Sequence, residues 1–341
     1  MRVLSLFDGV SCGRVALERA GVPVEKYYAS EIDKYAIQIT QKNYPDTVQL
    51  GDVTKVNFEE LIGKVDLLIG GSPCQGFSFA GKQLNFDDPR SKLFFEYVRA
   101  INTLKPKYFL LENVKMKQEY QDIISDLLRV KPIEINSSLV SAQNRKRLYW
   151  TNIPVGALVD QGILLKDIVH EHKDGYTKEE LFDYIVPFDK TLQIIDKEVV
   201  RGKVAYFRKD SQANRVYSIH GKGVTLCGEA GGGAAKMDQY LFGCITPDRI
   251  EKRQNGQRFN TGDKFYTLTA QDRHGVFIDG YIRKLTPIEC ERLQTLPDNY
   301  TAGIPNPQRY KCLGNGWTVD VIAHIFRGLK PFADSIFRLT A

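Results

Sequence analysis

Residues 67–78 read Leu67-Leu68-Ile69-Gly70-Gly71-Ser72-Pro73-Cys74-Gln75-Gly76-Phe77-Ser78, an apolar strand that runs into a turn and then a cysteine. In a parallel α/β sheet such a turn lies at the carboxyl edge, where these folds keep their ligands. Pro73 fixes its own φ and favours an extended backbone at Ser72, so the thiol of Cys74 is held in place. A held thiol is a candidate nucleophile. The plainer alternative is a small buried hydrophobe that ends a core strand.

The first 150 residues alternate short β-rich segments with amphipathic segments. Strands are expected at 3–7, 27–30, 65–69, 108–111 and 147–151. A turn and helix are expected at 9–20, a helix that follows the second strand and ends near Tyr44-Pro45, and a helix at 93–101. This alternation predicts an α/β fold with a doubly wound, mostly parallel, Rossmann-like sheet.

The alternation stops after residue 165. From about 171 to 280 the chain has short β-like segments and Gly-rich turns, which predicts a second, smaller, irregular β-rich domain. Helical patterning returns at 287–296 and 318–329. We therefore expect a first domain over 1–165, a second over 166–305, and a C-terminal segment over 306–341 that returns to the first.

Cysteine and histidine usage narrows the class of protein. The six cysteines lack C-x-x-C spacing, and the five histidines lack metal-ligand spacing, so neither a disulfide framework nor a metal site is expected. A reducing, intracellular location fits such cysteines. No apolar run approaches membrane-spanning length, and the chain enters a strand at once, as no signal peptide does.

The positive charge is concentrated in one segment. The segment 201–273 contains thirteen Lys and Arg against seven Asp and Glu, a difference of +6 that equals the net charge of the whole chain. This favours a polyanionic partner for that segment, although solvated surface charge is the alternative for each side chain.

Three loops favour an adenosine-type cofactor. The first, Leu6-Phe7-Asp8-Gly9-Val10-Ser11-Cys12-Gly13, joins a strand to a helix but is neither G-x-G-x-x-G nor a Walker loop. Glu31 follows the second strand, where a carboxylate can accept ribose hydroxyls. Asp52 follows a possible third strand and could meet an adenine edge. Each alone is common, as a turn glycine or a helix cap, but together on consecutive strands they favour such a cofactor.

Further polar side chains are expected at the edge that carries Cys74. Glu112 ends another central strand, and a partly buried carboxyl there is a candidate proton donor. Arg145 and Arg147, two residues apart on an extended segment, point the same way and are permanent donors for a carbonyl or phosphate oxygen.

In sequence order these motifs resemble the DNA (cytosine-5)-methyltransferase family. The resemblance covers the whole chain except roughly 165–275, and it extends to Arg283-Lys284-Leu285-Thr286-Pro287-x-Glu289-x-x-Arg292-Leu293-Gln294 and to Gly314-Asn315-Gly316. The compact length looks prokaryotic or viral, with some likeness to the animal de novo branch. The resemblance implies transfer of a methyl group from S-adenosylmethionine to C5 of a flipped-out cytosine in double-stranded DNA. It also implies that 166–305 is the target-recognition domain of a monomer working in the cytoplasm of a bacterial or phage-infected cell.

The resemblance also implies roles for individual residues. The catalytic residues are Cys74, which bonds to C6, Glu112 at N3, and Arg145 and Arg147 at O2 and the neighbouring phosphate. Implied cofactor contacts are Phe7, Asp8, Gly9, Ser11, Cys12, Gly13, Glu31, Ile32, Asp52, Val53, Pro73, Asn315 and Trp317. Expected DNA contacts are Gln75, Ser78, Arg201, Arg208, Lys209, Arg215, Lys252, Arg253 and Arg258.

Two departures and two alternatives accompany this resemblance. The family's usual Gly-Asn-Ser-Val is Gly-Asn-Gly-Trp here, so Trp317 either stacks near the cofactor or fills the core. The common glycine after Glu112-Asn113-Val114 is replaced by Lys115. One alternative is the same chemistry on structured RNA or with another one-carbon unit, against which the long insert favours duplex DNA. The other is a non-catalytic DNA-binding regulator, which would have lost the catalytic set that is present here.

Overall fold

The computed structural model describes residues 1–72, 89–164, 167–168 and 281–329, together with six strands between 192 and 278. For these six strands, for 89–92 and for 281–284, the description is of the backbone alone.

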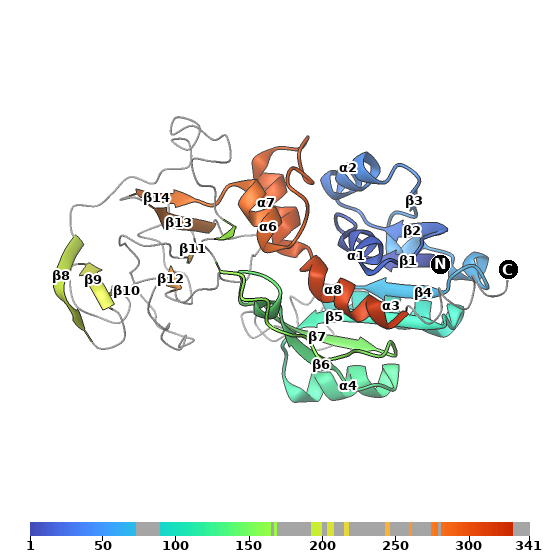
Figure 1. Ribbon diagram of the computed structural model, residues 1–341. Coiled ribbons are helices and arrows are strands. Elements are labelled where there is room, and N and C mark those ends of the chain that lie inside the picture. Colours follow the sequence, from blue (N-terminus) through green and yellow to red (C-terminus); the bar gives the residue numbers. More distant parts are fainter. Residues whose placement is uncertain are drawn as a thin grey trace.

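A mostly parallel sheet forms the centre of the first part of the chain (Figure 1). Its seven described strands lie in the order β3-β2-β1-β4-β5-β7-β6. They are β1 (Arg2–Leu6), β2 (Lys26–Ser30), β3 (Val48–Gln49), β4 (Leu67–Gly70), β5 (Tyr108–Val114), β6 (Ile133–Asn136) and β7 (Lys146–Thr151). The pairs from β3 to β5 are parallel, and β7 runs antiparallel to both β5 and β6. The predicted doubly wound fold is therefore confirmed.

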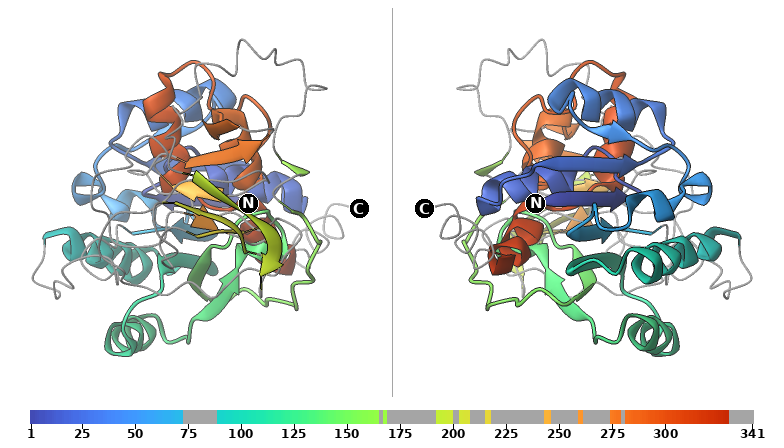
Figure 2. Two further views of the ribbon diagram at one scale, coloured as in Figure 1. Left: turned by 90° about the vertical axis from the view of Figure 1, so that its left-hand side faces the viewer. Right: turned by 90° about the vertical axis from the view of Figure 1, so that its right-hand side faces the viewer.

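Helices cover both faces of this sheet (Figure 2). They are α1 (Cys12–Ala20), α2 (Lys34–Asn43), α3 (Pro89–Leu104), α4 (Gln118–Leu128), α6 (Pro287–Leu293), α7 (Asn306–Asn315) and α8 (Val319–Phe326). Short 3-10 turns are η1 (Val53–Lys55), η2 (Phe58–Leu61), η3 (Ser137–Leu139) and η7 (Arg327–Leu329).

The two faces follow from the alternation of side chains along each strand. Leu67 and Ile69 of β4 pack with α1, α2 and α8, whereas Leu68 between them packs with α3. Because both faces of a central parallel strand are buried, β4 is an unbroken apolar run, and its four residues are all buried. The carboxyl edge of the sheet thereby carries the polar side chains that follow each strand.

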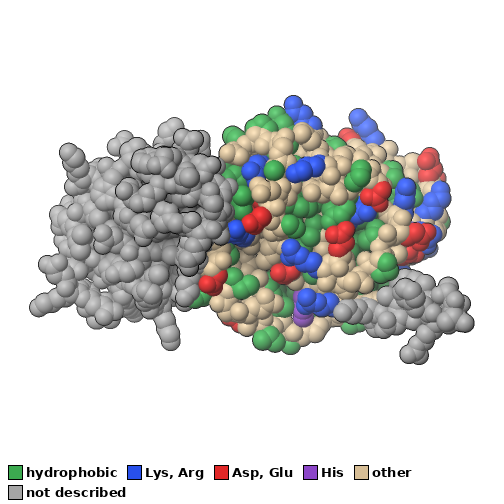
Figure 3. All heavy atoms as spheres, turned by 45° about the horizontal axis from the view of Figure 1, so that its top comes forward, with side chains coloured by type: hydrophobic (Ala, Val, Ile, Leu, Met, Phe, Trp, Pro, Cys, Tyr) green, Lys and Arg blue, Asp and Glu red, His purple; other side chains and the backbone are tan. Residues whose placement is uncertain are grey.

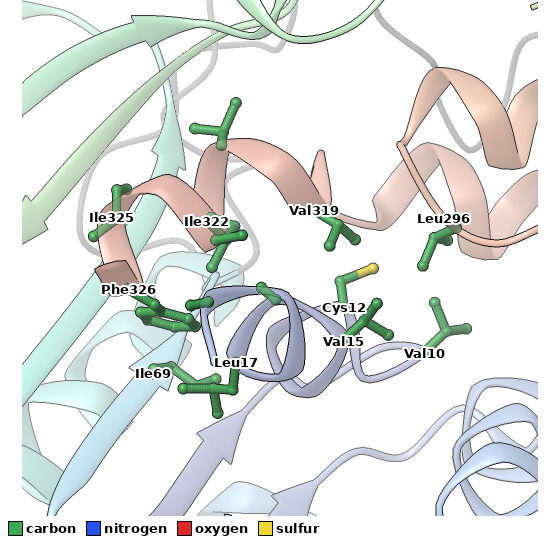
Figure 4. Close-up of a cluster of buried hydrophobic side chains, with 14 of the residues drawn as sticks. Val10, Cys12, Val15, Leu17, Ile69, Leu296, Val319, Ile322, Ile325 and Phe326 are labelled. Carbon is green, nitrogen blue, oxygen red and sulfur yellow. The ribbon is translucent and has the colours of Figure 1, made fainter. Parts of the chain in front are cut away.

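The C-terminal helices complete the core on the α1 face. Figure 4 shows Val319, Ile322 and Phe326 of α8 against Val15 and Leu17 of α1. Within the same core lie Leu285, Cys290, Leu293 and Leu296, from the part of the chain placed at sequence level in the second domain. Thr286 begins α6 with a capping box, in which Glu289 accepts from the Thr286 N–H and donates its own N–H to the Thr286 hydroxyl.

Two small antiparallel sheets occupy the segment predicted to be β-rich. One has the order β10-β9-β8, from β8 (Leu192–Val199), β9 (Lys203–Phe207) and β10 (Arg215–Tyr217). The other has the order β12-β11-β13-β14, from β11 (Gly243–Ile245), β12 (Phe259–Asn260), β13 (His274–Ile278) and β14 (Tyr281–Lys284).

Candidate active site

The carboxyl edge of β5 places a glutamate against an arginine. Glu112 Oε1 lies 3.0 Å from Arg147 Nε, and the exposed fractions of the two side chains are 10% and 14%. In the antiparallel register Arg147 faces Val114, so it is the diagonal neighbour of Glu112 on the same face. The structure thus brings together two of the predicted catalytic residues in a nearly dry ion pair.

The base of the cysteine loop lies directly beside this pair. Gly71 and Ser72 follow β4, and the Asn113 amide donates to the Ser72 hydroxyl at 3.3 Å. A β-carbon on Gly71 would lie 3.1 Å from Glu112 Oε2 and 2.9 Å from Trp317 Nε1. The next residues in sequence are Pro73, Cys74, Gln75 and Ser78 of the predicted site, which lie outside the described residues.

Gly71→Ala is expected to lower kcat/KM by about 10²-fold, because an ångström-scale displacement of a catalytic group costs about that much. The new methyl group must displace either the Glu112 carboxylate or the indole. Single-turnover methylation assays measure the effect. Gly156→Ala is the matched control, because a β-carbon there meets no heavy atom within 4 Å. Equal rates for the two variants would contradict this geometry.

The loop after β1 holds an unusual backbone conformation. Phe7, Gly9 and Ser11 all have left-handed φ values, of 57°, 60° and 58°. For a bulky residue such as Phe7 this costs on the order of 1–3 kcal/mol and persists only where the surroundings impose it. Here the Asp8 N–H donates to the Ser30 carbonyl, and the Gly9 N–H donates to Glu31 Oε2 at 2.8 Å. Strain of this kind is concentrated at functional sites.

Acidic side chains converge on this loop. Glu31 Oε1 accepts the N–H groups of Ile32 and Asp33 at 2.8 and 2.9 Å. With the bond from Gly9, three of about four acceptor positions of this carboxylate are used. One position on Oε2 can take a hydroxyl donor. Beside it Ile32 leaves 76% of its surface exposed, an apolar face next to a hydroxyl acceptor.

Asp52 lies one loop further along the same edge. Its Oδ1 accepts from the Thr54 N–H at 3.0 Å and from the Thr54 hydroxyl at 2.8 Å, so it caps η1. These bonds lower the pKa of the carboxyl group. The following residue, Val53, is buried in the core on the α3 face. Asp52 therefore presents its other oxygen at the edge, while Val53 holds the turn in place.

Asp8 has a perturbed pKa. Its carboxylate accepts from the Tyr27 hydroxyl at 2.8 Å and from the Ser11 hydroxyl. Burial raises the pKa of Asp8 to about 6, although the hydrogen bonds from Ser11 and Tyr27 lower it. Asp8 lies in the same loop region as Glu31, whose carboxylate accepts hydrogen bonds from backbone N–H groups.

The free energy of unfolding should therefore depend on pH through Asp8. A pKa raised from 3.8 to about 6 gives stability that is present below pH 4 and is lost as the pH rises through 6. Asp8→Asn removes this loss, so the variant should gain on the order of 2 kcal/mol over wild type between pH 4.5 and pH 7.5. Urea denaturation at both pH values measures it, and a pH-independent difference would refute the assignment.

Two predicted cofactor contacts, Cys12 and Gly13, lie in α1 and are packed against the core. Cys12 is 3% exposed and burial raises the pKa of its thiol to about 12, and Figure 4 shows the sulfur among Val319 and Leu296. A β-carbon on Gly13 would lie 2.4 Å from Ile69 Cδ1, so glycine is needed there for the helix to approach the sheet. Only the backbone of these residues is placed to meet a ligand.

Arg145 is also buried. Its guanidinium donates to the Gly316 carbonyl at 2.9 Å and to the Gly314 carbonyl at 3.5 Å, at the C-terminal end of α7. Burial and the charge of Arg147 lower the pKa of Arg145 to about 9, which leaves it cationic at neutral pH. The two predicted arginines thus have different surroundings, Arg147 beside Glu112 and Arg145 under the turn that follows α7.

That turn carries Asn315 and Trp317. Asn315 is exposed, and Trp317 is partly buried against the core on the α1 face. The indole extends from Gly13, where a β-carbon would be 3.4 Å from Trp317 Cζ3, to Gly71 beside Glu112. The Trp317 side chain therefore lies between the loop after β1 and the sheet edge that carries Glu112.

Sequence reasoning assigned no role to a buried cluster that supports this turn. Gln143, Gln294 and Thr318 are 0%, 0% and 3% exposed and are hydrogen bonded to one another. Gln294 lies in one of the quoted motifs and Gln143 lies two residues before Arg145, but their contact joins residues 151 positions apart.

The predicted DNA contacts lie outside the described residues, except that the backbone of Arg215 belongs to β10. On the described surface, Figure 3 shows both charge signs interspersed. Among the described residues no group of three His, Cys, Asp or Glu side chains could hold a metal, and no helix there is long and apolar enough to cross a membrane.

The sheet order and the polar side chains at its carboxyl edge are those of an α/β fold with a ligand site at that edge. A model of the C-5 cytosine-specific DNA methylase family matches residues 1–331. The chain belongs to this family and is an enzyme of the methyltransferase class. The expected prokaryotic or phage type is confirmed.

Its relatives include methyltransferases of phages and bacteria. The orphan methyltransferase M.SPRI of Bacillus phage SPR is 30% identical and covers 96% of this chain and 97% of its own length. The type II methyltransferase M.HhaI of Haemophilus parahaemolyticus is 28% identical over 95% of this chain and 93% of its own. Among solved structures, a prophage-encoded DNA modification methyltransferase of E. coli has a TM-score of 0.60, 21% identity and coverage of 97% and 99%. The S. pombe Dnmt2 methyltransferase has a TM-score of 0.59, 15% identity and the same coverage, and both structures share the fold.

Proposed function

We propose that this protein transfers the methyl group of S-adenosylmethionine to C5 of a cytosine flipped out of double-stranded DNA, through a covalent bond between Cys74 and C6. The observation that carries the proposal is the Glu112–Arg147 pair, which lies beside the Gly71–Ser72 turn that leads in sequence to Cys74. An acid, a guanidinium and a cysteine motif at one sheet edge suit addition to a pyrimidine ring.

The residues of the first loops fit the cofactor. S-adenosylmethionine supplies an electrophilic methyl group on a positively charged sulfur. Glu31 would accept a ribose hydroxyl with the free position of Oε2, and Ile32 would lie against the adenine with its exposed face. The carboxylates of Asp8 and Glu31 suit a cationic ligand. Asp52 would meet the adenine edge, and Trp317 would line the pocket.

The chain's own residues account for the change in the pyrimidine. Cys74, as the thiolate, adds to C6, and the electrons of the 5,6 double bond move towards N3 and O2. Glu112 protonates or hydrogen bonds N3, and Arg147 donates to O2, so the developing charge is offset. C5 then attacks the methyl group as a nucleophile. Loss of the C5 proton to a base and departure of Cys74 restore the double bond.

Base flipping is needed because a stacked base is not accessible to these groups, and unstacking costs a few kcal/mol. We propose that the basic segment within 166–305 is the target-recognition domain and offsets this cost through phosphate contacts. We also propose that the protein acts as a monomer in the cytoplasm of a bacterial or phage-infected cell, the setting that its phage and bacterial relatives suggest.

The proposal is tested by identifying the methylated nucleoside. Cells that express the protein should contain 5-methylcytosine in DNA at a defined sequence, seen by mass spectrometry of nucleosides and bisulfite-type mapping. Methyl groups found only in RNA, or on an exocyclic nitrogen of DNA, would contradict it.

Replacing Lys252 and Arg253 together by Gln should weaken DNA binding and reduce the slope of log K against log salt by about 2, since each phosphate contact contributes about 0.9. Fluorescence anisotropy at several salt concentrations measures the slope. The control is Lys64→Gln with Lys105→Gln, two exposed lysines that precede β4 and β5 at the opposite sheet edge. Equal slopes in both double variants would show that Lys252 and Arg253 do not contact DNA phosphates.

A further inference from the structure

The Gly316–Trp317 peptide unit is held at its carbonyl oxygen. Its carbonyl oxygen accepts from Arg145 at 2.9 Å and from the Gln294 amide at 3.2 Å, which uses both lone pairs. A carbonyl group held by Arg145, which precedes β7, and by Gln294, which follows α6, sets the direction in which the Trp317 side chain leaves the backbone.

Gln294 is the centre of the buried glutamine cluster (Gln143, Gln294 and Thr318). Its amide N–H groups donate to the Leu313 carbonyl at 2.6 Å and to the Gly316 carbonyl. Its amide oxygen accepts from the Gln143 amide at 2.8 Å and from the Thr318 hydroxyl at 3.0 Å. All four positions of this side chain are therefore used, and Gln143 holds the amide through a further bond of 2.6 Å to the Leu293 carbonyl.

The sequence around the turn is matched to this arrangement. A β-carbon on Gly316 would lie 3.2 Å from the Cys312 carbonyl oxygen and 3.3 Å from Cys12 Sγ. The serine found here in the family's usual motif would crowd the sulfur of this chain. Glycine lets α7 end against Cys12, and the next residue, Trp317, can then extend from Gly13 to Gly71.

We propose that Gln294 is a positioning residue and that Gln143 acts through it. Together they hold the Trp317 indole where it lines both the proposed cofactor pocket and the space beside Glu112. The role of the cofactor pocket rests on the proposed function. The placement of the indole by the glutamine cluster does not, because it is a property of the chain alone.

The test uses Trp317 as its own reporter. The chain has two tryptophans, and Trp150 is fully buried, so Trp150→Phe leaves Trp317 as the single emitter. In that background Gln294→Met keeps the side-chain volume but leaves the Leu313 carbonyl without this donor. We expect the emission of Trp317 to shift to longer wavelength and the Kd for S-adenosylmethionine, measured by calorimetry, to rise about tenfold. Gln143→Met, which removes the donor to the Gln294 amide oxygen, should show a smaller shift in the same direction.

Ser141→Ala is the matched control. Its hydroxyl donates to the same Leu293 carbonyl at 2.6 Å and is equally buried, so its loss carries a similar packing cost. We expect unchanged emission and a Kd within twofold of the parent. If Gln294→Met does not fold, Thr318→Val removes one donor to Gln294 and should give a smaller shift.

Emission from folded Gln294→Met or Thr318→Val that equals the parent's would overturn the proposal, as would an equal change in Ser141→Ala. Absence of S-adenosylmethionine binding to the parent would instead refute the proposed cofactor. The emission comparison, made without any ligand, would still decide whether the cluster sets the indole.

Discussion

Glu112→Gln should slow methyl transfer by about 10²- to 10⁴-fold, the range that a positioned acid contributes. The amide keeps the shape of the side chain and can still accept from Arg147, which lies 3.0 Å away. It cannot give a proton to N3 as charge develops on the ring. The defect should therefore appear in the chemical step, measured under single-turnover conditions.

Binding should be spared in this variant. The Kd for S-adenosylmethionine and for DNA should stay within about threefold, since the side chain is shielded by the sheet edge. Glu134→Gln is the control, because Glu134 is a carboxylate on β6 of the same sheet that pairs with Lys115 and Lys146. A single-turnover rate for Glu112→Gln equal to that of the control would exclude the acid role.

Cys74→Ser should reduce methyl transfer by at least about 10³-fold, because a hydroxyl is a far weaker nucleophile than a thiolate and no other group can take its place at C6. Cofactor and DNA binding should persist, since serine is close to cysteine in size and the implied binding contacts are made by other residues. Cys290→Ala serves as the control for loss of a thiol. Cys290 is 1% exposed, and burial raises its pKa well above the ordinary value, so it is not reactive. Full turnover in Cys74→Ser would show that Cys74 is not the nucleophile.

Much of the fold could be predicted because its signals are local. The apolar run of β4 and the spacing of Phe94, Tyr97 and Ile101 in α3 can each be recognised within a short stretch of sequence. Helix α7 was not predicted, because it begins beside two prolines, ends at Gly314-Asn315 and has few apolar residues. Its helical state depends on packing and on the bonds from Arg145 and Gln294 rather than on its own pattern.

The residues of the site also divide into those that could be predicted from the sequence and those that could not. Glu31 and Asp52 follow strands and Glu112 lies near the end of β5, and the topology of a parallel sheet places them at one edge. The burial of Cys12 and the different surroundings of Arg145 and Arg147 depend on α7 and α8, which reach the edge from the far end of the chain. Spacing of two residues showed that the arginines share a face, but it could not show that the Gly314 and Gly316 carbonyls occupy one of them.

The covalent bond between protein and base is the most direct measure of the proposed chemistry. A duplex carrying 5-fluorocytosine at the target position, incubated with the protein and S-adenosylmethionine, should give a complex stable to denaturation. After methyl transfer, C5 holds fluorine where a proton would leave, so the thiol cannot depart. Peptide mass spectrometry should find the methylated base on Cys74. An adduct on another residue, or none from protein that methylates ordinary DNA, would contradict the account.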